Sequence, residues 1–236
     1  MNMGFEIIYP TPSYPAGVTG VGLYGKSWTS GGDVALFKSH LRTTLLETQL
    51  YRCCFCRRGL YEPGAIHLEH FIDHAKFNVY RFEIRNLALS CEICNVKKAG
   101  YFKTWAARYK RLTKSLPATR TPVVKTQIVA GTPYPTISTD FRWVNPHVHK
   151  YSEHIVLTRG WVFTGISREG RRTIRGLRMN MLIDVERRAM ETRLGMRGGM
   201  LSTLVGALAE VDQHRARDVA HAVVKVIQRR RKPRIG

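Results

Sequence analysis

Two closely spaced cysteine pairs constrain the fold of this chain more than any other feature of its sequence. The pairs are Cys53-x-x-Cys56 and Cys91-x-x-Cys94, and all five cysteines fall between positions 53 and 94. Each pair can place two thiolates on one edge of a tetrahedral zinc ion, whereas small disulfide-bonded domains scatter their cysteines. The sequence therefore predicts a structural zinc site made by these four residues, with Cys54 in the core; a shift of ligation to Cys54 is the alternative role for this residue. Buried thiols without a metal are the alternative interpretation.

The net charge indicates the kind of partner. The 236 residues include 38 Lys and Arg against 17 Asp and Glu, a formal net charge of +21 with a pI near 10.3. Such a chain favours polyanions, either nucleic acid or an anionic membrane. No apolar run approaches the roughly 20 residues of a membrane span, and the opening residues lack the basic and apolar regions of a secretory signal. We therefore expect a cytoplasmic protein with nucleic acid, and no membrane, as its partner.

Hydrophobic patterning predicts an α+β fold. After an irregular arm, a helix is expected from Asp33 as N-cap. Its apolar stripe comprises Val34, Phe37, Leu41, Leu45 and Tyr51. Alternation predicts strands in AIHLEHF and FEIRNLALSC, and a basic helix should follow Cys94. Pro and Thr dominate residues 115–139, which indicates a long loop or linker. Three more strands are expected in FRWVNP, HIVLTRG and WVFTGIS, then helices near 172–195 and 199–228.

The region of the cysteine pairs resembles the HNH nuclease family. The match covers about residues 51–100 and includes both C-x-x-C pairs. Its other elements, in order along the chain, are the acid–His pair Glu69-His70, the pair Asn86-Leu87, and Cys94-Asn95-x-x-Lys98. The resemblance implies a ββα-metal core, in which two strands and a helix hold a catalytic metal beside the structural zinc.

The same resemblance assigns a role to each polar residue of the pattern. His70 would be the general base, Asn86 the residue that orients it, and Lys98 a phosphate contact. Glu69 and Asn95 would bind Mg²⁺ or Mn²⁺. These residue types suit phosphodiester hydrolysis, because a His with a reference pKa of about 6.5 can deprotonate water near neutral pH. Carboxylate and amide oxygens are also ligands that Mg²⁺ accepts.

A second acid–His pair leaves the catalytic pair open. Asp73-His74 follows closely, and the acidic residue of the first pair is Glu69 where many HNH enzymes have Asp. Glu69-His70 is favoured because it ends the alternating run IHLEH, where the family places its pair.

Basic residues near the core and in the tail are candidates for contacts with DNA. They are Lys97, Lys98, Lys103, Arg229, Arg230 and Arg231. On the helix expected after Cys94, the spacing of Tyr101, Phe102, Trp105 and Tyr109 favours core packing over base stacking.

Near the N-terminus, GVGLYGKS (residues 20–27) matches the G-x-x-x-x-G-K-S pattern of a phosphate-binding loop. A working loop of that kind follows a buried strand and opens a helix. Here three prolines precede the pattern and Trp28-Thr-Ser-Gly-Gly follows it, so neither element is expected. We interpret the match as accidental; if it binds phosphate at all, DNA is a better ligand than ATP.

The sequence thus predicts a metal-dependent HNH endonuclease that nicks or cleaves DNA. The alternative, from another class, is a catalytically silent zinc-ribbon protein that binds nucleic acid. That alternative needs the cysteines and the positive charge but has no use for Glu69-His70, Asn86 and Asn95 in family order.

The expected organisation is an N-terminal arm and helix (1–50), the nuclease core (51–114), a linker or long loop (115–140) and a basic strand-and-helix region (141–236). In the last region, WVNPHVHKYSEHIV and GRRTIRGLRMN loosely resemble small HNH proteins of prokaryotic anti-phage systems such as Septu and Zorya. This resemblance implies other subunits of a defence system as further partners.

Overall fold

The protein has a mixed α+β structure that divides into two compact units, Met1–Leu182 and Ile183–Gly236. The residues described by the computed structural model are 4–61, 63–115, 118–158 and 161–196. The described residues of the second unit, 183–196, all belong to the helix α5 (Leu182–Met196). The helix expected at 199–228 and the arginines of the tail lie outside the described residues.

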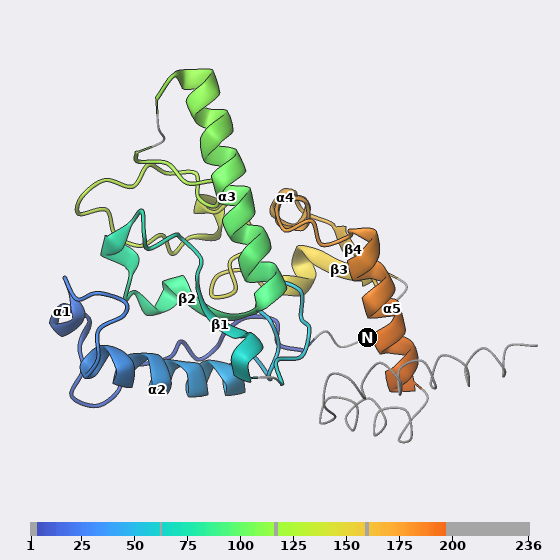
Figure 1. Ribbon diagram of the computed structural model, residues 1–236, viewed down its shortest axis with the longest axis horizontal. Helices are drawn as coiled ribbons and strands as arrows, with labels where there is room; N and C mark the ends of the chain where they lie inside the picture. Colours follow the sequence, from blue (N-terminus) through green and yellow to red (C-terminus); the bar gives the residue numbers. More distant parts are fainter. Residues whose placement is uncertain (1–3, 62, 116–117, 159–160, 197–236) are drawn as a thin grey trace, which may run out of the picture. The chain divides into compact units, whose positions relative to one another are not determined.

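A two-stranded antiparallel sheet and the helix that follows it form the centre of the first unit. The strands are β1 (Ile66–His70) and β2 (Leu87–Cys91), with Ile66 opposite Cys91 at one end and His70 opposite Leu87 at the other. The helix α3 (Glu92–Thr113) starts directly after β2 and packs against both strands. Figure 1 shows α3 rising from the sheet while α2 runs below it. The two expected strands are confirmed, although β2 is shorter than FEIRNLALSC.

The helix α2 (Asp33–Thr48) supports β2 from below. Its buried face is the expected stripe of Val34, Phe37, Leu41 and Leu45, each with no exposed surface. Two details of the prediction were wrong. Asp33 is the first helical residue, because Gly32 takes the N-cap position with φ +58°, and Tyr51 lies beyond the helix with half of its surface exposed.

Residues 115–140 are largely irregular but are packed into the first unit. Apart from the short turn Ser138–Asp140 and an isolated bridge from Val124 to Phe141, their described part holds no helix or strand. Thr121, Val123, Val124, Ile128 and Tyr134 are nevertheless buried. The segment therefore covers the core instead of crossing solvent.

The prediction of a strand in FRWVNP was wrong. Trp143, Val144 and Asn145 are consecutive and all buried, so the segment lacks the two faces of a half-buried strand. Its backbone is satisfied by other partners: Arg142 N–H donates to Val123 O at 2.7 Å, and Val144 N–H donates to Thr173 Oγ1 at 2.9 Å. Hydrogen bonds to residues distant in the sequence thus take the place of a sheet ladder.

The other two strands are confirmed as β3 (Ile155–Thr158) and β4 (Val162–Gly165), which pair antiparallel before α4 (Arg168–Gly176). The helix expected near 172–195 is interrupted after Gly176. A Cβ at Gly176 would lie 2.1 Å from a ring carbon of Trp143, so only glycine permits this contact. Arg178 then takes a φ of +47°, which ends the helix.

Short helical turns complete the first unit. One is α1 (Gly20–Leu23), and the remaining 3₁₀ turns are Pro63–Ala65, Asn78–Tyr80, Ile84–Asn86 and Tyr151–Glu153.

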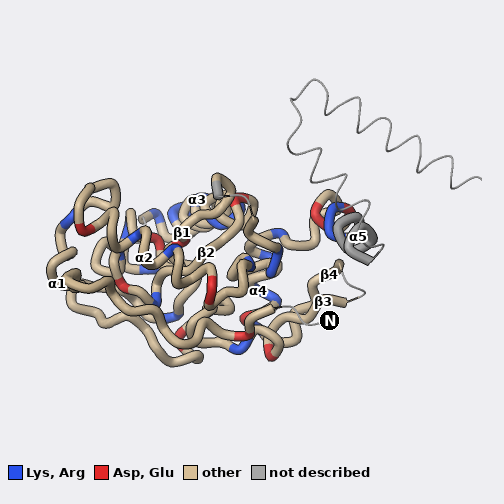
Figure 2. The backbone as a smooth tube through the Cα atoms, turned by 90° about the horizontal axis from the view of Figure 1, so that it is seen from below, with Lys and Arg blue, Asp and Glu red and all other residues tan. Residues whose placement is uncertain are grey.

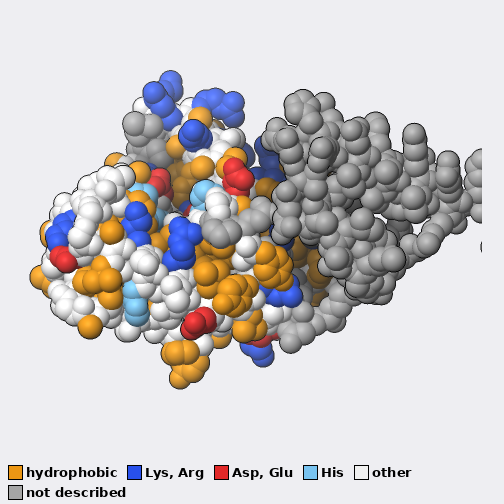
Figure 3. Space-filling model, turned by 60° about the horizontal axis from the view of Figure 1, so that its bottom comes forward, with side chains coloured by type: hydrophobic (Ala, Val, Ile, Leu, Met, Phe, Trp, Pro, Cys, Tyr) orange, Lys and Arg blue, Asp and Glu red, His pale blue; other side chains and the backbone are white. Residues whose placement is uncertain are grey.

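The charge on α3 is almost entirely positive. Apart from Glu92 in the first turn, every charged residue of this helix is Lys or Arg, and Figure 2 shows basic positions along it. Figure 3 shows Lys and Arg side chains gathered at the upper edge of one face of the described part. None of the described helices is long and apolar enough to cross a membrane.

Candidate functional site

Four cysteine sulfurs meet at one end of the β1–β2 sheet. The Sγ atoms of Cys53, Cys56, Cys91 and Cys94 all lie within 4.8 Å of one another, and those of Cys56 and Cys91 are 3.7 Å apart. A tetrahedral site with zinc–sulfur bonds of about 2.3 Å has edges of about 3.8 Å. The cluster is therefore compatible with a structural zinc site made by the four predicted residues.

Local backbone geometry brings the cysteines together. After Cys53 the chain turns tightly, with Arg57 N–H donating to Cys53 O at 3.1 Å while Arg57 takes a φ of +59°. Cys91 ends β2 and caps α3, which places Cys94 in the first turn of the helix. Although burial opposes ionisation, hydrogen bonds from the neighbouring cysteines hold the pKa of Cys53 well below its usual range.

Cys54 is not part of this cluster. It is buried, and its N–H donates to Leu89 O of β2 at 2.9 Å. Burial raises the pKa of its thiol. The residue therefore belongs to the core, as the sequence predicted.

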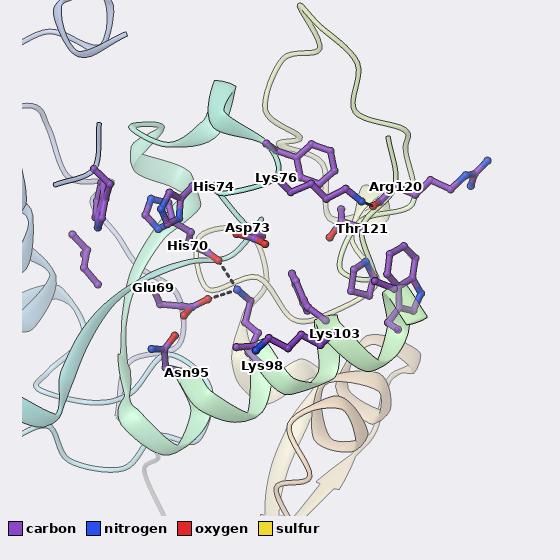
Figure 4. A pocket seen from close by; sticks show the side chains of 18 residues that line it. Glu69, His70, Asp73, His74, Lys76, Asn95, Lys98, Lys103, Arg120 and Thr121 are labelled. Carbon is purple, nitrogen blue, oxygen red and sulfur yellow. Dashed lines mark hydrogen bonds and ion pairs between the residues drawn. The ribbon is translucent and has the colours of Figure 1, made fainter. Parts of the chain in front are cut away.

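A cavity of about 470 Å³ lies at the opposite end of the sheet. Figure 4 shows Glu69 and His70 on one side, Asn95, Lys98 and Lys103 of α3 below, and the segment of Arg120 and Thr121 across the opening. The structure thus gathers five of the predicted site residues around one cavity, namely Glu69, His70, Asn95, Lys98 and Lys103.

His70 ends β1 and is held in one tautomer. Its Nε2 lies 2.9 Å from the carbonyl oxygen of Arg81. A carbonyl can only accept, so Nε2–H is the donor and Nδ1 keeps a free lone pair. Burial, followed by the nearby His74, lowers the pKa of His70 to about 3. The imidazole is therefore neutral at physiological pH.

Glu69 and Lys98 form a buried ion pair beside His70. Lys98 Nζ contacts Glu69 Oε1 and also donates to the backbone oxygen of His70 at 2.5 Å. Burial raises the pKa of Glu69, and the Lys98 ammonium acts in the opposite direction. A carboxylate oxygen and a carbonyl oxygen thus already bind a cationic group at this point. Asn95, one turn earlier on α3, places its amide below Glu69 (Figure 4).

Asn86 does not line the cavity but fixes the loop that encloses it. Its Oδ1 accepts from Ile72 N–H at 2.7 Å, and its Nδ2 donates to Ile72 O and Tyr80 O, both at 3.0 Å. These bonds close the loop between β1 and β2, which carries Arg81. Asn86 therefore holds the backbone of Phe71 and Ile72, which follow His70, and of Tyr80, which precedes Arg81. None of the hydrogen bonds found in the described residues joins it to His70 itself.

The second acid–His pair shares this cavity. Asp73 and His74 both line it, and the rings of His70 and His74 are stacked with centroids 3.9 Å apart. Burial lowers the pKa of His74, and Asp73 opposes this shift. Both acid–His pairs are thus placed where one substrate could reach them.

The predicted DNA contacts fall in three different environments. Lys103 lines the cavity with an exposed side chain. Lys98 is buried at the cavity floor. Lys97 does not line the cavity, and its ammonium donates to Arg178 O at 3.2 Å. Arg229, Arg230 and Arg231 lie outside the described residues.

Several cavity residues were missed because they come from segments without a recognisable pattern. Trp28 of the N-terminal arm packs edge-on against His70, with ring centroids 4.4 Å apart. Lys76 donates to Arg120 O at 2.7 Å and thereby joins the β1–β2 loop to the irregular segment that carries Thr121. Hydrophobic periodicity gives no signal for such contacts, because neither segment is a regular element.

The segment GVGLYGKS has a structural role at this site. Lys26 forms an exposed ion pair with Asp33 at 2.6 Å, and its backbone oxygen accepts from Arg81 at 2.6 Å. Within the described residues no strand precedes α1, and no helix begins between α1 and α2. In the described residues the pattern therefore lacks the strand and the helix that frame a phosphate-binding loop.

Comparisons of the chain with protein-family models, curated proteins and solved structures found no match.

Proposed function

We propose that this protein is a metal-dependent HNH endonuclease that hydrolyses phosphodiester bonds in DNA. The observation that carries the proposal is His70, held by Arg81 O with Nδ1 free, in one cavity with Glu69 and Asn95. The strand–strand–helix arrangement around it supports a ββα-metal core. The net charge of +21 supports DNA as the substrate.

His70 is the general base in this proposal. Its Nδ1 accepts a proton from the attacking water, while the bond from Nε2 to Arg81 O fixes the ring. A base with a pKa of about 3 is weak. A scissile phosphate brings negative charge beside the ring, which raises the pKa of His70 in the complex and strengthens it as a base.

Glu69 and Asn95 would hold a Mg²⁺ or Mn²⁺ ion. Their carboxylate and amide oxygens are hard donors, and the oxygens around Lys98 Nζ already accept a cation, so the residues present fit such an ion. The bound ion would stabilise negative charge on the phosphate and the leaving oxygen. Burial raises the pKa of Glu69; the Lys98 ammonium opposes this rise and places a second positive charge at the cavity floor.

Zinc has a separate, structural role in the proposal. Four cysteine ligands leave no open position for substrate, as in closed structural sites. Bound zinc would fix the junction of β2 and α3, and α3 carries Asn95 and Lys98 to the cavity.

The rival function is a silent zinc-ribbon protein that binds nucleic acid. It accounts for the cysteines and the charge but not for a buried His with a free Nδ1 next to a carboxylate–ammonium pair. The loose resemblance of the C-terminal region to anti-phage HNH proteins extends the proposal to prokaryotic defence in the cytoplasm, with other subunits of such a system as partners.

Plasmid nicking tests the proposal. Supercoiled plasmid is incubated with the full chain with and without added Mg²⁺, and nicked and linear forms are resolved. We expect nicking only with the metal. Asn95→Ala should lose cleavage and regain part of it at raised Mg²⁺, because a ligand is weakened while the base remains. Asn78→Ala, an exposed residue outside this cavity, is the matched control. Absence of Mg²⁺-dependent nicking, with DNA binding intact, would favour the rival.

A further inference from the structure

A second cavity of about 390 Å³ adjoins the candidate active site. Trp105, Arg120, Thr121 and Pro122 line both cavities, so the two share a wall. The second cavity lies between α3, the segment 120–126 and α4. Apart from α3, these elements lie outside residues 51–100, which carry the HNH motif residues.

The charges of the second cavity are all positive. Its lining includes five cationic residues and, among the described residues, no acid. The five are Arg120, Lys125, Arg142, Arg172 and Arg175. Burial, followed by the nearby Arg172 and Arg120, lowers the pKa of Arg142. Such crowding of cations destabilises the free protein and would be relieved by a bound anion.

Aromatic and polar groups complete the lining. Trp105 and Tyr109, one helical turn apart on α3, are both partly exposed with ring centroids 5.4 Å apart. The expected core packing on this helix holds for Tyr101 and Phe102, which contact the buried Trp143, although Tyr101 also lines the second cavity. Trp105 and Tyr109 line this cavity without packing against the core. Thr121 Oγ1 is buried and has no hydrogen-bond partner among the described residues.

We propose that the second cavity binds single-stranded DNA adjacent to the bond that is cut. The arginines contact successive phosphates, and an unpaired base stacks on Trp105 and Tyr109. Aromatic faces inside a cationic cavity suit single strands, because bases in a duplex are already stacked and would present only phosphates. This proposal rests on the proposed nuclease function, because that function defines where the bond is cut. It specifies the substrate as a strand with unpaired nucleotides beside the cleaved phosphate.

Binding without cleavage tests the phosphate contacts. Fluorescence anisotropy of labelled oligothymidylate is measured at several salt concentrations without added divalent ions, with the same oligonucleotide paired to oligodeoxyadenylate as the duplex probe. The slope of log affinity against log salt changes by about 0.7 for each phosphate contact on a single strand. Arg172→Ala/Arg175→Ala should therefore flatten the slope by about 1.4. Arg168→Ala/Arg171→Ala removes equal charge from α4 outside the cavity and should leave it unchanged.

The stacking contact predicts a different response. Trp105→Leu should weaken oligothymidylate binding roughly 5- to 150-fold without changing the salt slope, because stacking releases no counterions. Tyr61→Leu, which removes a 79%-exposed ring outside the cavity, should have no effect. Zinc content and the melting curve of each variant establish that it is folded.

The outcomes separate the two proposals. Tighter binding of the duplex by the wild type, or equal effects of the two arginine pairs, would overturn the single-strand site even if the protein nicks plasmid. Conversely, the wild type could fail to cleave DNA while the substitutions at Arg172, Arg175 and Trp105 still weaken single-strand binding. That result would support the single-strand site and contradict the proposed nuclease function.

Discussion

The two ends of the β1–β2 sheet differ in how they are built. At the end where Ile66 faces Cys91, four cysteine side chains come together. Two belong to the turn that begins at Cys53, and two to the junction of β2 and α3. At the end where His70 faces Leu87, the cavity is assembled from segments as distant as Trp28 and Thr121. The cysteine cluster is therefore built from two closely spaced pairs, whereas the cavity draws on several segments between Trp28 and Pro122.

The largest effect is expected at the cysteine end. Cys91→Ser should abolish zinc binding and unfold the protein, because structural zinc contributes of order 10 kcal/mol, comparable to the whole stability of a domain. Cys54→Ala, which removes a buried thiol outside the cluster, should keep the zinc. Elemental analysis and circular dichroism provide the measurement. A Cys91→Ser protein that is folded and as stable as the wild type would contradict the zinc site.

A smaller effect is expected from His147, which ties the C-terminal part of the first unit to the cavity end. Its Nε2 donates to Leu87 O at 2.7 Å, and its buried Nδ1 has no partner in the described part of the chain. Burial lowers its pKa to about 4. The unfolded chain, with a His pKa of about 6.5, therefore binds a proton first, and stability falls as the pH drops from 6.5 to 4.

This pH effect can be isolated by substitution. Between pH 7 and pH 5.5 the wild type should lose about 1 kcal/mol of unfolding free energy through His147, and His147→Gln should not lose this part. Urea unfolding of both proteins at the two pH values measures the difference. Equal losses in the two proteins would show that His147 is not held neutral by the fold.

The smallest effect is expected from Trp28, which is far from His70 in the sequence but packs against its ring. Trp28→Ala should lower cleavage roughly 2- to 10-fold, because aromatic contacts contribute about 0.5–1.5 kcal/mol to the placement of the ring they hold. Zinc content should not change. Tyr24→Ala, which removes a 77%-exposed ring of the same arm, is the control. A loss of zinc in Trp28→Ala would mean that the two ends are not independent.

The same contrast explains what could be predicted from sequence. The cysteine cluster, the two strands and the stripe of α2 were predicted because spacing and periodicity encode them locally. Two features were not predicted, the irregular segment at Val144 and the helix break after Gly176. Val144 depends on a tertiary hydrogen bond with Thr173, and Gly176 on a close contact with Trp143. Trp28 and Thr121 reach the cavity for the same reason, and no local pattern indicates them.

The central claim is that catalysis resides at the cavity end and zinc at the other. Its most direct test is the rate at which His70→Ala nicks supercoiled plasmid with Mg²⁺, with zinc measured in the same sample. The account predicts a loss of at least about a hundredfold, the lower end of general-base contributions, with zinc and DNA binding retained and only a mild effect of His74→Ala. Full activity of His70→Ala with loss in His74→Ala would move the catalytic pair to Asp73-His74, and full activity of both variants would contradict the HNH mechanism.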